Sequence, residues 1–112
     1  MFGAPRGAVI EALEAEGVPC SPGYGFSLPQ QPMFLKKAFG PYLPNRSHKL
    51  DFRKVRCPNS DLLAREQCIW LGQELFLGTR RDMDKIADAF EKIHANAEAL
   101  KSWWTKRGRE RR

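Results

Sequence analysis

The segment from Gly25 to Asn59 constrains the fold more than any other part of the chain. Prolines and glycines recur along it at positions Pro29, Pro32, Gly40, Pro41, Pro44 and Pro58. Because proline lacks the amide hydrogen that helices and sheets use, this spacing excludes a long regular element, and only a short helix is predicted, around residues 31–39. The segment also carries many apolar side chains, among them Phe26, Leu28, Met33, Phe34, Leu35, Phe39, Tyr42 and Leu43. A long loop of this composition is expected to pack against another surface.

Regular elements are predicted on both sides of this segment. A first helix is expected from Pro5 to Gly17, because proline suits a first turn and glycine commonly ends a helix. The extended stretch VPCSPGY (18–24) follows it. Beyond the loop, PNSDLLAREQ (58–67) predicts a second helix, and CIWLGQELFLG (68–78) predicts a buried strand with an irregular continuation at its glycine.

The last predicted element is a long amphipathic helix. Thr79 and Asp82 match the spacing of a capping box at its start. Apolar residues then recur at helical spacing for about six turns, which is typical of a core-facing stripe: Met83, Ile86, Ala87, Phe90, Ile93, Ala97, Leu100 and Trp104. The resulting order is helix, strand, long loop, helix, strand, helix. It predicts an α+β fold with two visible strands, and a two-stranded sheet is marginal by itself.

Length, charge and cysteine spacing narrow the class of protein. The chain has 112 residues, which suits one domain, predicted here as residues 1–104 with a basic tail at 105–112. Its net charge is +6, and the last twelve residues hold six Lys or Arg and one Glu. Since the rest of the chain is nearly neutral, nucleic acid is not expected as a partner. Three widely spaced cysteines, Cys20, Cys57 and Cys68, predict free thiols and no metal site.

The sequence shows no segment that predicts a membrane or a secreted location. No apolar run approaches ~18 residues, the length that a membrane-spanning helix needs. The first 17 residues include glutamates where a signal peptide requires an uninterrupted apolar stretch. A cytoplasmic protein without a membrane partner is therefore expected.

Several segments in a fixed order resemble a known family. These are APRGAVIEALEAEGVPCSPGY, then SLPQQPMF, then AREQCIWLGQELFLGTRRDMDKIADAFEKI. Together they resemble the C-terminal end of DegT/DnrJ/StrS-type aminotransferases. These are fold type I pyridoxal phosphate enzymes of the aspartate aminotransferase superfamily, which act mostly on nucleotide-linked keto sugars or keto-cyclitols. The resemblance covers roughly residues 3–95. It implies the small C-terminal domain of such an enzyme, with a small antiparallel sheet of two to three strands covered by helices. The chain is expected to be a fragment of it, without the large domain and without the first strand of the small sheet.

The resemblance also bears on catalysis and on the cofactor. In the family, the lysine that forms the internal aldimine and the phosphate site lie in the large domain, and this chain has no matching motif. The chain alone is therefore expected to bind no pyridoxal phosphate, to contribute no catalytic residue and not to transaminate. Family members place the loop that begins GY and continues to QP at the active-site cleft. This implies a substrate or interface role for Tyr24, Gln31 and Phe34. Pro29 stands where many members have histidine or tyrosine, which puts that substrate contact in doubt.

Two functions from different classes remain open on the sequence. The first is an aminotransferase C-terminal domain that is inactive alone. The second is a small basic binding module that uses the aromatic loop and the basic tail. In the first case a homodimer is expected, through the loop of residues 24–39 or through the open edge of the sheet, because exposed edges and apolar loops favour association.

Overall fold

The computed structural model describes residues 3–38, 40 and 51–110, apart from the side chains of residues 109 and 110. The chain divides into two compact units. We call residues Met1–Gly23 and Glu66–Arg112 the core unit, and residues Tyr24–Arg65 the loop unit. The predicted boundary at residue 104 falls inside a helix of the core unit, and Phe39, Tyr42 and Leu43 of the predicted loop lie outside the described residues.

Helix α1 spans Arg6–Ala15 and begins after Pro5, as predicted. It ends where Gly17 adopts a positive φ of 83°, a conformation that glycine reaches without the steric cost of a Cβ atom. The amide of Val18 then donates to the carbonyl of Leu13 at 2.9 Å, which turns the chain toward the first strand. The side chains of Ala8, Val9 and Leu13 are buried on one face of α1.

The sheet consists of two short antiparallel strands. Strand β1 (Cys20–Ser21) pairs with β2 (Trp70–Leu71), with Cys20 opposite Leu71 and Ser21 opposite Trp70. The predicted α+β class and small antiparallel sheet are thus confirmed, and the described sheet has two strands, where two to three were predicted. The second strand is shorter and less buried than predicted. After Gly72 the chain enters the 3-10 helix η6 (Gln73–Leu77), and the Trp70 side chain is 49% exposed.

The long C-terminal helix predicted from the sequence is two helices. Helix α4 spans Arg80–Ala95 and begins with the predicted capping box of Thr79 and Asp82. Asn96 interrupts it, and α5 continues from Ala97 to Glu110. The side-chain amide of Asn96 donates to the carbonyl of Lys92 at 2.8 Å and so takes a carbonyl in the last turn of α4.

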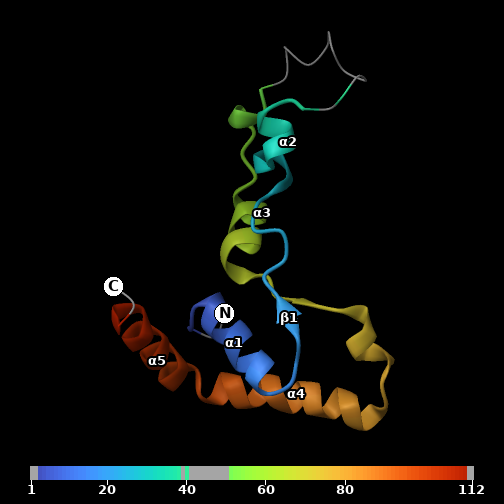
Figure 1. Ribbon diagram of the computed structural model, residues 1–112, viewed down its shortest axis with the longest axis vertical. Coiled ribbons are helices and arrows are strands. Elements are labelled where there is room, and N and C mark those ends of the chain that lie inside the picture. The colour runs from blue at the N-terminus through green and yellow to red at the C-terminus, as the bar shows by residue number, and fades with distance from the viewer. Residues whose placement is uncertain (1–2, 39, 41–50, 111–112) are drawn as a thin grey trace. The chain divides into compact units, whose positions relative to one another are not determined.

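The core lies where α1 packs against α4 and α5 (Figure 1). Its buried apolar side chains are Ala4, Val9, Leu13, Val18, Ala89 and Ile93. Partly buried side chains of both strands and of η6 extend this cluster, among them Cys20, Leu71 and Leu75. No described helix combines the length and the apolar character that a membrane-crossing segment needs.

A charged contact joins the C-terminal part of α5 to α1. The guanidinium of Arg107 forms an ion pair with the Glu11 carboxylate. It also lies 5.2 Å from the ring centroid of Trp103 and 6.0 Å from that of Trp104, which are cation–π distances. Arg107, in the segment predicted as a basic tail, thus has an acidic partner on α1 and two indole rings beside it.

In the part of the loop unit that the structure describes, the regular elements are short helical segments. Before the undescribed stretch at 41–50 these are η1 (Leu28–Gln30) and α2 (Pro32–Leu35), the latter within the range predicted for a short helix. After it come η4 (Phe52–Lys54) and α3 (Pro58–Leu62), and α3 continues as the π-helical segment η5 (Leu63–Gln67). The helix predicted over residues 58–67 is thus confirmed. Among the described residues of this unit, Ser27 alone is buried, so the unit has no apolar core there.

Candidate functional site

Four side chains of the loop unit surround a small hollow. Tyr24, Phe26, Leu28 and Gln31 line it, and its volume is about 260 Å³. The side-chain amide of Gln31 donates to the carbonyl of Phe26 at 3.3 Å, which holds the two sides of the turn together. The structure therefore brings Tyr24 and Gln31 to one place. Their predicted role in substrate or interface contact stays a prediction.

Phe34, the third predicted residue, does not line this hollow. Its ring meets the ring of Phe52 edge-on, with 5.1 Å between the centroids. This contact joins α2 to η4, on either side of the undescribed stretch. Phe34 thus helps to hold the loop unit together, because edge-to-face aromatic pairs stabilise beyond their buried area.

The hollow is anchored to α3 by two polar contacts that the sequence did not indicate. The buried hydroxyl of Ser27 donates to the carboxylate of Asp61. The guanidinium of Arg65 donates to the side-chain oxygen of Gln30. Hydrogen bonds to a charged partner are stronger than neutral ones, so these contacts fix the hollow's backbone against the helix that follows the undescribed stretch. No local sequence pattern marks them, because the partners lie 34 and 35 residues apart.

The chemistry available at the hollow is recognition rather than acid–base catalysis. Tyr24 contributes a phenol and Gln31 an amide, while Phe26 and Leu28 contribute apolar walls. The Tyr24 side chain is 75% exposed and Leu28 is 67% exposed, so the hollow is open to a partner. Such a surface can bind a ring or an apolar group and orient it by one or two hydrogen bonds. Within the described ranges no three His, Cys, Asp or Glu side chains gather as metal ligands.

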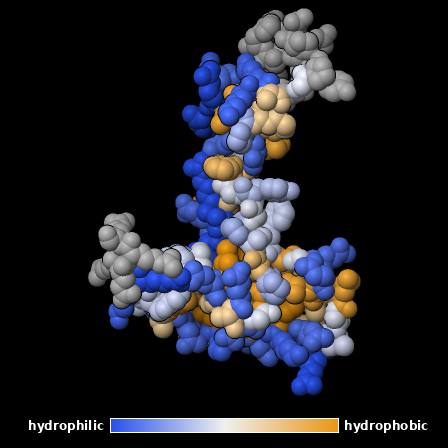
Figure 2. All heavy atoms as spheres, viewed as in Figure 1, coloured by the Kyte–Doolittle hydropathy of each residue, from blue (hydrophilic) through white to orange (hydrophobic). Residues whose placement is uncertain are grey.

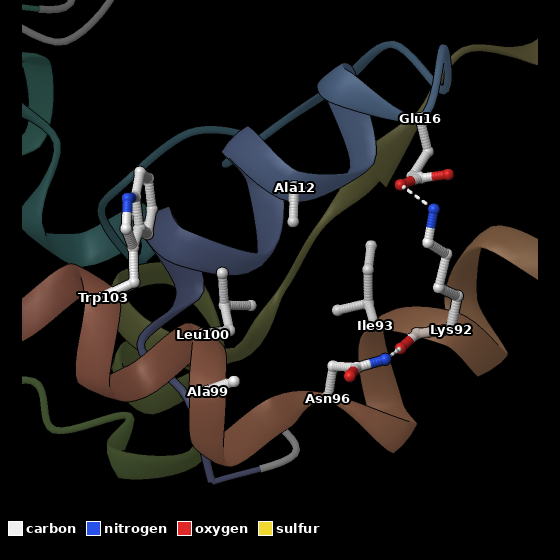
Figure 3. A pocket seen from close by; sticks show the side chains of 8 residues that line it. All are labelled: Ala12, Glu16, Lys92, Ile93, Asn96, Ala99, Leu100 and Trp103. Carbon is white, nitrogen blue, oxygen red and sulfur yellow. Dashed lines mark hydrogen bonds and ion pairs between the residues drawn. The ribbon is translucent and has the colours of Figure 1, made fainter.

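A second hollow lies in the core unit, between α1 and the junction of α4 with α5 (Figure 3). Its volume is about 380 Å³, and its lining residues are Ala12, Glu16, Lys92, Ile93, Asn96, Ala99, Leu100 and Trp103. The ammonium of Lys92 lies 2.7 Å from a carboxylate oxygen of Glu16, and this ion pair forms one side of the hollow. The opposite side is apolar and ends at the Trp103 ring.

Neither hollow fits pyridoxal phosphate. An aldimine needs a lysine amine that can lose its proton, and the phosphate needs several amide or cationic donors that converge on it. The hollow around Tyr24 has no lysine in its lining. The hollow around Trp103 has Lys92, whose ammonium is paired with Glu16, but no arginine and no second lysine.

The cysteines are free thiols in the structure, and Cys20 is the one with a distinctive environment. Burial raises the pKa of its thiol, and the nearby Glu14 carboxylate raises it further. The thiolate is the nucleophilic form, so a raised pKa makes Cys20 a structural side chain rather than a reactive one. It contributes to the apolar cluster beside β1.

Arg6 of α1 contacts the segments next to both strands, which no local sequence pattern indicated. The guanidinium of Arg6 donates to the carbonyl of Pro22 at 3.3 Å and to that of Cys68 at 3.5 Å. These two carbonyls lie just after β1 and just before β2. Arg6 therefore ties the exit of one strand to the entrance of the other, at the base of the GY turn.

Comparison of the chain with protein-family models, with curated proteins and with solved structures gives no match. The case for a function consequently depends on the chain's own residues. The relevant features are the order of its elements, the strand pairing, the hollow at Tyr24 and the distribution of charge.

Proposed function

We propose that the chain is the small C-terminal domain of a DegT/DnrJ/StrS-type aminotransferase that acts on keto sugars or keto-cyclitols. The observation that carries the proposal is the pairing of β1 with β2. It joins the two halves of the family-like sequence, EGVPCS and CIWL, across the loop unit and places the GY turn directly after the first strand. The order of helix, strand, loop, helix, strand and helix supports the same assignment.

In this proposal the chain supplies recognition and the rest of the enzyme supplies the chemistry. The hollow of Tyr24, Phe26, Leu28 and Gln31 faces the substrate or the domain interface. The lysine, the phosphate site and pyridoxal phosphate belong to a large domain outside this sequence, together with the strand that completes the small sheet. The chain alone then has no transaminase activity. A cytoplasmic location is part of the proposal and suits three cysteines that are free thiols.

The proposal includes a homodimer that covers the apolar side chains of the loop of residues 24–39. Phe26 is 51% exposed, Leu28 67% and Met33 49%. Burial of such side chains is favourable, and a twofold dimer is the commonest closed assembly. The exposed loop supports association through this surface.

The test begins with the DNA directly upstream of the coding sequence. We expect it to encode a domain with a pyridoxal phosphate lysine. Co-expression of that domain with this chain should give amino transfer to a nucleotide-linked keto sugar. Tyr24→Phe and Gln31→Ala should raise KM at nearly constant kcat, because the hollow binds substrate without reacting. Gln73→Ala, at an exposed glutamine of η6, is the matched control and should leave both constants unchanged.

The opposite outcome would favour the small basic binding module. In that case no such domain is encoded upstream, and the purified chain binds a polyanion with an affinity that falls steeply with salt. A stoichiometric pyridoxal phosphate adduct on one lysine of this chain alone would also contradict the proposal. It would show in the absorbance between about 390 and 430 nm, where protein-bound aldimines absorb.

A further inference from the structure

The two units of the chain differ sharply in charge. The loop unit holds eight Lys or Arg and two Asp, a net charge of +6, which equals that of the whole chain. The core unit holds eleven cations and eleven carboxylates. Within the core unit, the last twelve residues carry +5 and the remainder carries −5. Residues 1–100 are therefore nearly neutral only because the positive charge of the loop unit and the negative charge of the remainder cancel.

Five of the six described cations of the loop unit lie on or beside two neighbouring elements, and the sixth, Arg65, lies in η5. Lys36 and Lys37 follow α2, while Arg53 and Lys54 belong to η4 and Arg56 follows it. The contact between Phe34 and Phe52 holds α2 against η4. Arg53 is paired with the carboxylate of Asp51 at 2.8 Å.

The loop unit has only two acids, Asp51 and Asp61, against eight cations, and each of the two has a hydrogen-bond partner within the unit. The hydrogen bond from Arg53 keeps the pKa of Asp51 below its ordinary value, and Asp61 accepts a hydrogen bond from Ser27. The side chains of Lys36, Lys54 and Arg56 are exposed. Arg56 donates to the backbone carbonyl of Arg53 at 2.7 Å, which orients its guanidinium without neutralising it.

Exposed apolar side chains accompany these cations. Among them are Phe26, Leu28, Met33 and Leu35, the last of which is 43% exposed. Figure 2 shows hydrophobic and hydrophilic side chains next to each other on this part of the chain. A nucleic acid binds mainly through cations and aromatic rings, whereas exposed leucine and methionine side chains gain most from burial against an apolar protein surface. An acidic protein surface with an apolar part fits both features.

The core unit has an acidic helix face and, just before it in the chain, exposed apolar side chains. Asp84, Asp88 and Glu91 recur at the i, i+4 and i+7 positions of α4, so they lie on one face of the helix. Ala89 and Ile93, which are buried, lie on the opposite face. Directly before α4, in η6, the side chain of Phe76 is 52% exposed and that of Leu77 is 77% exposed. We call the acidic stripe together with these two side chains the α4 face.

We propose that the loop unit of one copy docks on the α4 face of a second copy, and the reverse, in a twofold dimer. Lys54 and Arg56 pair with Asp88 and Glu91, while apolar side chains of the loop unit meet Phe76 and Leu77. Asp84 contributes less, because Arg80 of its own helix lies 3.0 Å away. This inference rests on the proposed dimer and names the surface that receives the loop unit.

A charge-exchange experiment tests the docking. Lys54→Glu/Arg56→Glu and Asp88→Lys/Glu91→Lys are prepared as two full-length double variants. In sedimentation equilibrium, each alone should have a dimer Kd at least about tenfold above that of the wild type, because like charges then oppose each other. An equimolar mixture of the two should regain heterodimer affinity close to that of the wild type. Lys101→Glu/Lys106→Glu makes the same change of charge on α5 and should leave the Kd unchanged.

The outcomes separate this inference from the proposed dimer. A dimer that neither variant weakens, or a mixture that fails to recover, overturns the docking on α4 and leaves a dimer through another surface. A monomeric wild type overturns both. Salt dependence of the wild type provides a measurement that needs no folded variant. The dimer should weaken as salt is raised, and a salt-independent Kd overturns the charge pairing.

Discussion

At the scale of single residues, Gly23 explains why the GY turn has its sequence. Its φ is +73°, in the region that favours glycine. A Cβ atom there would also lie 2.6 Å from Nε1 of Trp70, so the indole covers the glycine closely. The sequence predicted a turn at this glycine, but the indole that covers it is 47 positions away and no local pattern indicates it.

Gly23→Ala should therefore lower the free energy of unfolding of the core unit by more than the cost of the positive φ alone. A positive φ costs an L-residue about 1–2 kcal/mol, and displacement of Trp70 adds to this. Gly17→Ala is the matched control, because Gly17 also has a positive φ but no atom within 4 Å of the Cβ position. Urea denaturation of both variants checks the difference. Equal losses of stability would contradict a close contact between Gly23 and Trp70.

The capping box of α4 should make stability depend on acid. Hydrogen bonds from the Thr79 hydroxyl and backbone, and then Lys85, lower the pKa of Asp82 from 3.8 to about 2. Because the folded pKa is the lower one, the stabilisation is fully present above about pH 4 and is lost as the pH falls toward 2. Thermal unfolding, followed by circular dichroism at pH values from about 5 down to about 2, measures this loss. Asp82→Asn should remove this part of the pH dependence, while Glu98→Gln, at an exposed carboxylate of α5, should retain it.

At the scale of elements, the sequence predicted what depends on local patterns. The first helix, the capping box and the short helix at α2 follow from proline, glycine and threonine positions, and the structure has them. The interruption at Asn96 was missed, because the apolar stripe continues through it and one asparagine alters helix propensity little. Its side-chain bond to the Lys92 carbonyl, together with the packing of α5, ends α4 there.

The packing of α5 against α1 depends on Gly7. A Cβ atom at Gly7 would lie 2.9 Å from Cη2 of Trp104, closer than real Cβ contacts allow. Gly7→Ala should consequently destabilise the wild type, although alanine normally stabilises a helix interior by about 1 kcal/mol relative to glycine. In a Trp104→Ala background the same change should become stabilising. The four proteins form a double-mutant cycle in urea denaturation, and an unchanged sign would show that Trp104 does not contact α1.

At the scale of the whole molecule, the charge pattern illustrates what a linear sequence hides. The sequence analysis assigned the basic character to the last residues, because they are contiguous. The structure assigns the net charge to the loop unit, whose boundaries at Gly23 and Arg65 follow from contacts rather than from composition. The apolar loop residues were expected to pack on something, and within the described chain many stay exposed. In the proposed dimer a second copy covers them, and such a partner surface is not encoded in local periodicity.

The two units should also differ in stability. The buried apolar cluster lies in the core unit, whereas the described part of the loop unit buries only Ser27. Since local opening is easiest where few apolar side chains are buried, amides of residues 24–38 and 51–65 should exchange with solvent faster than those of α1 and α4. Hydrogen exchange with mass spectrometry checks this.

Ile93→Val should lower protection in the core unit by about 0.5–1.5 kcal/mol and leave the loop unit nearly unchanged. Dilution that dissociates the dimer should further speed exchange in the loop unit, and a loop unit that stays protected at monomer concentrations would show that the chain covers this surface itself.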